Sequence, residues 1–179
     1  EIREAVDFLR YYAVQCRRDF AVPQKMPGPT GESNHLMMQG RGIFVCISPW
    51  NFPLAILVGM TMGPVAAGNT VVLKPASNTP LVGWGFMRIL EEAGMPPGVV
   101  NFLPGPGARV GDRLVDDPTT RFINFTGSKE VGLRIAERSA QVHEGQRWMK
   151  RACIPSSGNC AAKLIQFRPS PVTLSIGAA

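Results

Sequence analysis

The hydrophobic pattern of the chain alternates short apolar, β-rich runs with longer stretches of helical length. Strands of one main sheet are expected over residues 43–47, 70–73, 99–103, 122–125 and 146–150. The first two runs are uninterrupted rather than alternating, which is typical of parallel strands covered on both faces. A further short strand is expected over residues 35–39.

Helices are expected between these strands. Apolar residues recur at helical spacing over residues 1–20, and later helices are expected from about Leu54, over 81–93, over 108–115 and over 128–140. Residues 21–33 hold three prolines and two glycines and are expected to form a connector. The alternation of strand and helix predicts an α/β fold with a doubly wound, Rossmann-like parallel sheet.

The loop after the first strand carries the first candidate for chemistry. It reads Ser48-Pro49-Trp50-Asn51-Phe52-Pro53, and it lies at the carboxyl end of a strand, where open α/β sheets bind ligands. The prolines limit the freedom of the backbone, and the two rings can exclude water. Asn51 could therefore offer a preorganised N–H donor to a developing oxyanion. The alternative is that Asn51 caps the helix that starts near Leu54.

Two glycine clusters follow later strands. The first, over residues 105–111, has one residue too many for the usual dinucleotide fingerprint. The second cluster spans residues 127–132. No Lys-Ser/Thr pair follows Gly132, so this cluster is not the phosphate loop of an NTPase. Ser128 nevertheless stands near the start of a helix, whose free N–H groups and positive dipole end can hold a pyrophosphate. Ordinary capping of that helix by Ser128 is the alternative.

The charge and the cysteines narrow the classes of function. A net charge of +6 would fit a nucleic-acid partner, but the Lys and Arg residues are scattered, which favours a solvated surface. The cysteines form no CxxC pair, so neither a zinc site nor a disulfide framework is expected. Cys46 lies within an apolar strand and is expected to be a small buried hydrophobe. No membrane span or signal peptide is visible, and a cytoplasmic protein is expected.

Three segments, taken in order, resemble the aldehyde dehydrogenase superfamily. They read ISPWNFPLAILVGMTMGPVAAGNTVVLKPAS, NFLPGPGARVGD and FINFTGSKEVG. Within the superfamily the strongest likeness is to the NAD-linked branch that oxidises L-glutamate γ-semialdehyde to glutamate in proline degradation. The resemblance covers residues 1–151, and it implies the cofactor-binding part of that fold, in truncated form.

The resemblance also implies roles for individual residues. Asn51 matches the asparagine of the oxyanion hole, Lys74 matches a lysine that binds the adenosine ribose, and Gly107 matches a glycine beneath the adenine. The residues expected to contact NAD are Ser48, Trp50, Lys74, Ser77, Gly107, Gly127 and Ser128. Many NAD-preferring relatives carry Glu at the position of Ser77. Without that carboxylate a 2′-phosphate is not repelled, so use of NADP is open.

The rest of the family's machinery is not visible in the sequence. The family's reaction needs a cysteine nucleophile and a glutamate base, and the glutamate motif expected just after Arg151 is absent. Cys153 and Cys160 lack the nucleophile's motif, so this chain alone is expected to be inactive. Residues 152–179 are interpreted as a tail that does not belong to the family. A frameshift in the coding sequence is the hypothesis for the origin of this tail.

Two other functions stay open at this point. Because the chain begins with Glu1, it is expected to be a piece of a longer protein or a processed product. The parent enzyme is expected to be a homo-oligomer that acts on a small aldehyde and needs no metal, nucleic acid or membrane. The alternatives are a stand-alone nucleotide-binding or assembly module without catalysis, and a basic domain that binds nucleic acid.

Overall fold

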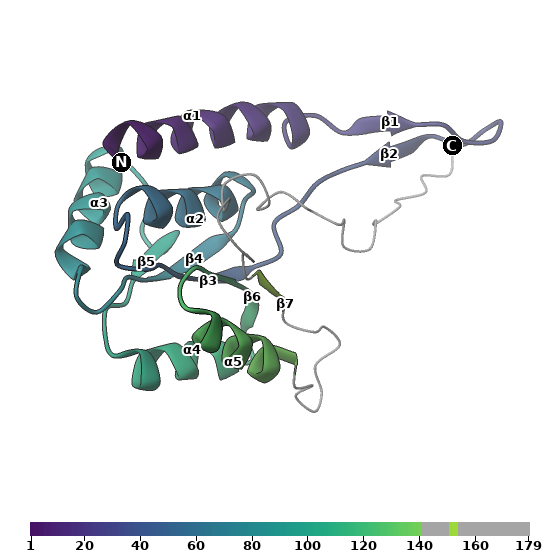
Figure 1. The fold of residues 1–179 in the computed structure, drawn as a ribbon. Coiled ribbons are helices and arrows are strands. Elements are labelled where there is room, and N and C mark those ends of the chain that lie inside the picture. Colours follow the sequence, from purple (N-terminus) through teal and green to yellow (C-terminus); the bar gives the residue numbers. More distant parts are fainter. Residues whose placement is uncertain (141–150, 154–179) are drawn as a thin grey trace.

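A computed structural model of the chain describes residues 1–140 and the backbone of 151–153 (Figure 1). The helices are α1 (Ile2–Asp19), α2 (Ala55–Ala66), α3 (Pro80–Glu92), α4 (Asp112–Asp116) and α5 (Lys129–Ala140), with a π-helical turn η1 (Gly107–Gly111) before α4. The strands are β1 (Gln24–Met26), β2 (Asn34–Leu36), β3 (Ile43–Ile47), β4 (Thr70–Lys74), β5 (Val100–Phe102), β6 (Thr120–Phe125) and β7 (Arg151–Cys153).

The main sheet is parallel and has the strand order β5-β4-β3-β6-β7. The chain starts this sheet at β3, adds β4 and β5 on one side, and then returns to add β6 and β7 on the other. Figure 1 shows α1, α2 and α3 on one side of the sheet and α4 and α5 on the opposite side. The predicted α/β class with a doubly wound parallel sheet is therefore confirmed.

Each face of the sheet has its own apolar core. The core under α1, α2 and α3 includes Phe44, Cys46, Leu73 and Leu57, all of them buried. The core on the α4 and α5 face is smaller and consists of Val45, Val115, Ile123, Phe125 and Ile135. Coverage on both faces explains why the strands read as continuous apolar runs.

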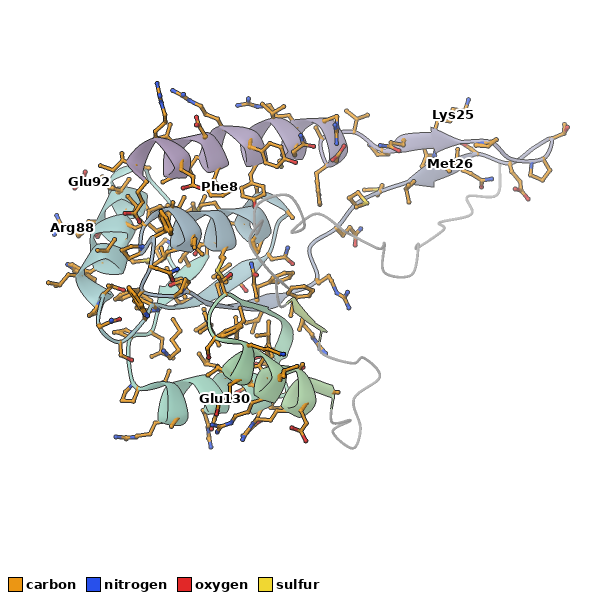
Figure 2. All side chains as sticks on the ribbon, viewed as in Figure 1. Phe8, Lys25, Met26, Arg88, Glu92 and Glu130 are labelled. Carbon is orange, nitrogen blue, oxygen red and sulfur yellow. The ribbon has the colours of Figure 1, made fainter. Side chains whose placement is uncertain are left out.

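Helix α1 packs on α2 through two glycines. An added Cβ at Gly59 would lie 3.1 Å from the Phe8 ring, and one at Gly63 would lie 3.2 Å from the Tyr12 ring. Figure 2 shows Phe8 pointing from α1 toward α2. The i, i+4 glycine pair on α2 therefore receives the i, i+4 aromatic pair on α1, which lets the two helices approach closely.

A carbonyl that a proline leaves unpaired in α2 accepts hydrogen bonds from the sheet. Pro64 has no N–H, so the carbonyl of Met60 loses its partner within the helix. The thiol of Cys46 donates to that carbonyl at 3.1 Å, and the Nδ2 of Asn124 donates to it at 3.3 Å. Strands β3 and β6 thus satisfy the oxygen that the proline leaves unpaired.

The structure differs from the sequence expectations at three places. Residues 24–26, expected in a connector, form β1, which pairs with β2 in an exposed antiparallel arm beside the main body (Figure 1). The short helix expected over 108–115 begins as the π-helical turn η1. The short strand expected over residues 35–39 has only three residues and lies at Asn34–Leu36, as β2.

Other expectations fall outside what the structure describes. The strand expected over residues 146–150 lies there, and so does most of the predicted tail, from 154 to 179. The described strand β7 begins at Arg151. Within the described parts, no helix combines the length and apolar character needed to cross a membrane.

Candidate cofactor site

The carboxyl ends of three neighbouring strands meet at one edge of the sheet. Ile47, the last residue of β3, pairs with Lys74 of β4 and with Phe125 of β6. The ladder continues one step further, because the N–H of Ser48 donates to the carbonyl of Lys74 at 3.1 Å and that of Thr126 donates to the carbonyl of Ile47 at 3.2 Å. The loops that follow these strands therefore leave the sheet at the same level. A switch point of this kind, where neighbouring loops diverge, is where such sheets bind ligands.

Ser48 is buried at this edge without a partner for its side chain. It is 4% exposed, and its Oγ is the only buried side-chain oxygen or nitrogen in the described residues that lacks a hydrogen bond. A buried hydroxyl without a partner costs free energy unless a ligand or water completes it. Ser48 was predicted from the sequence as a cofactor contact.

Lys74 is also buried, with 4% of its surface exposed. Its Nζ donates to the carbonyl of Pro75 at 3.2 Å, and no ion pair with a carboxylate is found in the described residues. Burial lowers the pKa of this ammonium below its ordinary value of 10.5. Its stem lies beside η1, because an added Cβ at Gly111 would be 3.8 Å from its Cε. Lys74 is therefore not an ordinary surface charge.

The segment after β5 borders the same edge. The Ser77 hydroxyl donates to the carbonyl of Gly105 at 3.1 Å, which ties the loop after β4 to the loop before η1. At Gly107 an added Cβ would meet no atom within 4 Å, so the space above this glycine is open. An open glycine at a strand end is a place where a flat group could lie against the backbone.

The start of α5 lies after β6. Ser128 caps this helix, since its Oγ accepts a hydrogen bond from the N–H of Val131 at 3.4 Å. Gly127 comes just before it, and both residues are exposed. The capping role expected for Ser128 is therefore present, and capping leaves other N–H groups of the first turn available for an anion.

The loop that carries Asn51 leads into α2, whose first N–H groups are capped by a residue from the start of the chain. Helix α2 begins after Leu54, and the N–H groups of Leu54 and Ala55 donate to Oε1 of Glu1 at 2.6 and 3.3 Å. The expectation that Asn51 caps this helix is wrong, because the Glu1 carboxylate takes that place. Asn51 is exposed, and no hydrogen bond of its side chain is found in the described residues.

The rings beside Asn51 do not enclose it. Trp50 is 65% exposed and Phe52 is 55% exposed. Contrary to the expectation from the sequence, the two rings therefore do not exclude water from Asn51 in this chain. Phe52 has a φ of 52°, the only positive value among the described residues other than glycine. Such a conformation costs roughly 1–3 kcal/mol and often occurs at functional sites.

The described cysteines and acids form no further centre. Cys46 is fully buried, and burial raises the pKa of its thiol, as expected for a small buried hydrophobe. No group of three or more His, Cys, Asp or Glu residues in the described ranges is arranged to hold a metal ion. The polar groups at the carboxyl edge of the sheet are therefore the best candidate for a ligand site.

Comparison with known proteins identifies the class of protein that this fold and site define. A sequence model of the aldehyde dehydrogenase family matches residues 1–162, so the chain belongs to the aldehyde dehydrogenase family. Over 157 residues it is 52% identical to a 1-pyrroline-5-carboxylate dehydrogenase of Anoxybacillus flavithermus, a match that covers 87% of this chain and 30% of that protein. The chain thus spans less than a third of the length of such relatives.

Solved structures agree with this assignment. A 1-pyrroline-5-carboxylate dehydrogenase from Thermus with bound NAD superposes with a TM-score of 0.80 at 52% identity, over 87% of this chain and 30% of that one. Proline utilization A from Bdellovibrio bacteriovorus superposes with a TM-score of 0.81 at 47% identity, over 87% of this chain and 16% of that one. The resemblance predicted from the sequence motifs is confirmed.

Proposed function

We propose that this chain is the cofactor-binding part of an NAD-dependent aldehyde dehydrogenase that oxidises L-glutamate γ-semialdehyde to glutamate in proline degradation. The observation that carries the proposal is the meeting of Ser48, Lys74 and the start of α5 at one edge of the sheet. The substrate is proposed from the similarity to 1-pyrroline-5-carboxylate dehydrogenases.

The residues at this edge fit a dinucleotide. Among the described residues, the buried hydroxyl of Ser48 has no hydrogen-bond partner and the Lys74 ammonium has no carboxylate to neutralise it, and Gly107 leaves open space. In the proposal the start of α5, at Gly127 and Ser128, holds the pyrophosphate. The complete set of proposed contacts is Ser48, Trp50, Lys74, Ser77, Gly107, Gly127 and Ser128.

Each element has a separate task in the proposed reaction. When bound, the cofactor supplies the hydride acceptor. Asn51 would donate its amide N–H to the oxyanion of the aldehyde-derived group and so stabilise it. Lys74 binds the adenosine ribose, and its buried stem fixes where the ammonium lies. The nucleophilic thiolate and the general base belong to parts of the enzyme that this chain is not proposed to supply.

Several finer points belong to the same proposal. Ser77 places no carboxylate near the adenosine ribose, so we propose that NADP is accepted as well as NAD. The parent enzyme is proposed to be a cytoplasmic homo-oligomer without a metal, a membrane or a nucleic-acid partner. The second candidate is a nucleotide-binding module without catalysis, which the exposure of Asn51 and Trp50 favours.

Substituting Gly107 by alanine tests the proposal. We expect Gly107→Ala to fold as stably as the original chain, since the added Cβ meets no protein atom within 4 Å. Its affinity for NAD should fall about tenfold, or about 1.4 kcal/mol, because the methyl group takes space proposed for the ligand. Isothermal titration calorimetry with NAD gives the affinities, and thermal unfolding gives the stabilities.

Gly85→Ala is the matched control. Gly85 lies in α3, and an added Cβ there also meets no atom within 4 Å. Its NAD affinity should equal that of the original chain. If Gly107→Ala binds NAD as tightly as Gly85→Ala, the adenine half of the proposed site is not at η1.

A further inference from the structure

An ion-pair cluster joins the two helices on one face of the sheet. Arg134 of α5 pairs with Asp112 of α4, and Arg138 pairs with Asp116. The Nε of Arg138 donates to Asp116 at 3.0 Å, and another of its nitrogens lies 3.7 Å from Asp112. We call these residues the α4–α5 cluster. Asp112 is shared between two arginines, so its loss breaks two of the links at once.

The spacing of the pairs fixes how the helices lie. Asp112–Arg134 and Asp116–Arg138 are both separated by 22 residues in sequence. A constant offset over one turn means that α4 and α5 run in the same direction and in register. Both start from the carboxyl edge of the sheet, and both bury a side chain, Val115 and Ile135, in the same small core.

The same register leads to the proposed cofactor site. One turn closer to the sheet edge, α4 leads back into η1 at Gly107, and α5 leads back to its start at Ser128. The cluster therefore lies about one turn below the two segments proposed to bind the adenine and the pyrophosphate. These segments come from loops after different strands, β5 and β6.

We propose that the α4–α5 cluster is a positioning device, which holds η1 and the start of α5 at the separation that a dinucleotide needs to contact both. The proposal rests on the proposed function. The side chains of the cluster are between 27% and 53% exposed, and surface pairs of this kind add little to global stability. Their main effect is therefore on geometry, because a ligand that spans both segments binds best when the spacing is already set.

Positioning and simple electrostatics predict opposite results for Asp112→Asn. Removing a negative charge near an anionic ligand strengthens binding if charge alone matters. If the cluster sets the spacing, NAD should bind about fivefold more weakly. Inorganic pyrophosphate, which contacts only the start of α5, should not lose affinity. Asp112→Glu keeps the charge and should recover most of the NAD affinity.

The matched control is Arg88→Gln. Arg88 forms exposed pairs with Glu91 and Glu92 inside α3, away from α4 and α5, and Figure 2 shows Arg88 and Glu92 together there. Calorimetry with NAD and with pyrophosphate, at 0.05 and 0.5 M salt, should show a loss for Asp112→Asn only with NAD. Salt screens the ion pairs, so the difference between Asp112→Asn and the original chain should shrink at 0.5 M.

Two measurements separate the possible failures. NAD affinity in Asp112→Asn equal to or above that of the original chain overturns the proposal about the cluster. If the original chain itself does not bind NAD, the proposed function fails, and hydrogen exchange then decides about the cluster. Faster exchange over residues 107–111 and 129–134 in Asp112→Asn, but not in Arg88→Gln, supports the positioning role, and equal exchange overturns it.

Discussion

Replacing Lys74 by methionine is expected to stabilise the fold and to weaken NAD binding. The side chain is 4% exposed, its ammonium donates to the carbonyl of Pro75, and burial lowers its pKa. An apolar side chain of similar length removes that desolvation cost, so the free energy of unfolding at neutral pH should rise by about 1–3 kcal/mol. The affinity for NAD should fall about tenfold or more, since a hydrogen bond to a charged group contributes about 1.5–3 kcal/mol.

The dependence on pH gives a second readout for Lys74. Because its pKa is lower in the folded than in the unfolded chain, the unfolded chain binds more protons between that lowered pKa and 10.5. The free energy of unfolding should therefore rise with pH through this window, as the cost of the buried charge disappears. The Cys46 thiol, whose pKa is raised by burial, acts in the opposite sense and is present in both proteins. The difference between the original chain and Lys74→Met thus isolates Lys74.

Lys25→Met is the control for this experiment. Lys25 lies on β1 in the exposed arm, as Figure 2 shows, and its side chain points into solvent. Chemical denaturation at several pH values and NAD calorimetry should show no comparable change for it. A Lys74→Met chain that is less stable than the original at neutral pH would contradict the view that the buried ammonium is kept for binding rather than for the fold.

Replacing Asn124 by alanine is expected to destabilise the chain strongly. Asn124 is 3% exposed and donates to the Met60 carbonyl, which Pro64 leaves without a helical partner. Loss of this buried hydrogen bond and of the side-chain volume should lower the free energy of unfolding by about 3 kcal/mol. Asn101→Ala, which removes an amide from the more exposed strand β5, should cost less than about 1 kcal/mol.

A double-mutant cycle with Pro64→Ala tests whether the unpaired Met60 carbonyl causes the cost of Asn124→Ala. Alanine at position 64 supplies the N–H that proline lacks, so the Met60 carbonyl regains a partner inside α2. The cost of Asn124→Ala should then fall by about 1 kcal/mol, measured by chemical denaturation. An equal cost in both backgrounds would mean that Asn124 is needed for its packing and not for the carbonyl that Pro64 exposes.

The sequence was sufficient to predict strands β3, β4, β5 and β6 of the main sheet, whereas β7 at Arg151–Cys153 was not predicted. The strands at Ile43–Ile47 and Thr70–Lys74 are continuous apolar runs because helices cover both of their faces. The arm could not be predicted in the same way, since β1 (Gln24–Met26) is exposed along its whole length and carries no apolar pattern. Its pairing with β2 depends on backbone hydrogen bonds, which leave little trace in side-chain chemistry.

The candidate site could be predicted only in part. The strand-end positions of Lys74 and Ser128 follow from the local pattern, and the structure places them at the same edge. The carboxylate of Glu1 that caps α2 could not be found, because it lies 53 residues from Leu54 in sequence. The sequence does show that Pro64 frees a carbonyl, but not that Asn124, 64 residues from Met60, donates to it.

The central claim is that a dinucleotide binds at the carboxyl edge of the sheet, and amide NMR spectra of the chain titrated with NAD test it most directly. The largest shifts should fall on residues 48–51, 74–77, 105–111 and 127–132. Gly42, Asn69 and Gly98, at the opposite edge of the sheet, should change little. Shifts centred on that opposite edge, or none at millimolar NAD, would contradict the assignment of this chain as the cofactor-binding part of an aldehyde dehydrogenase.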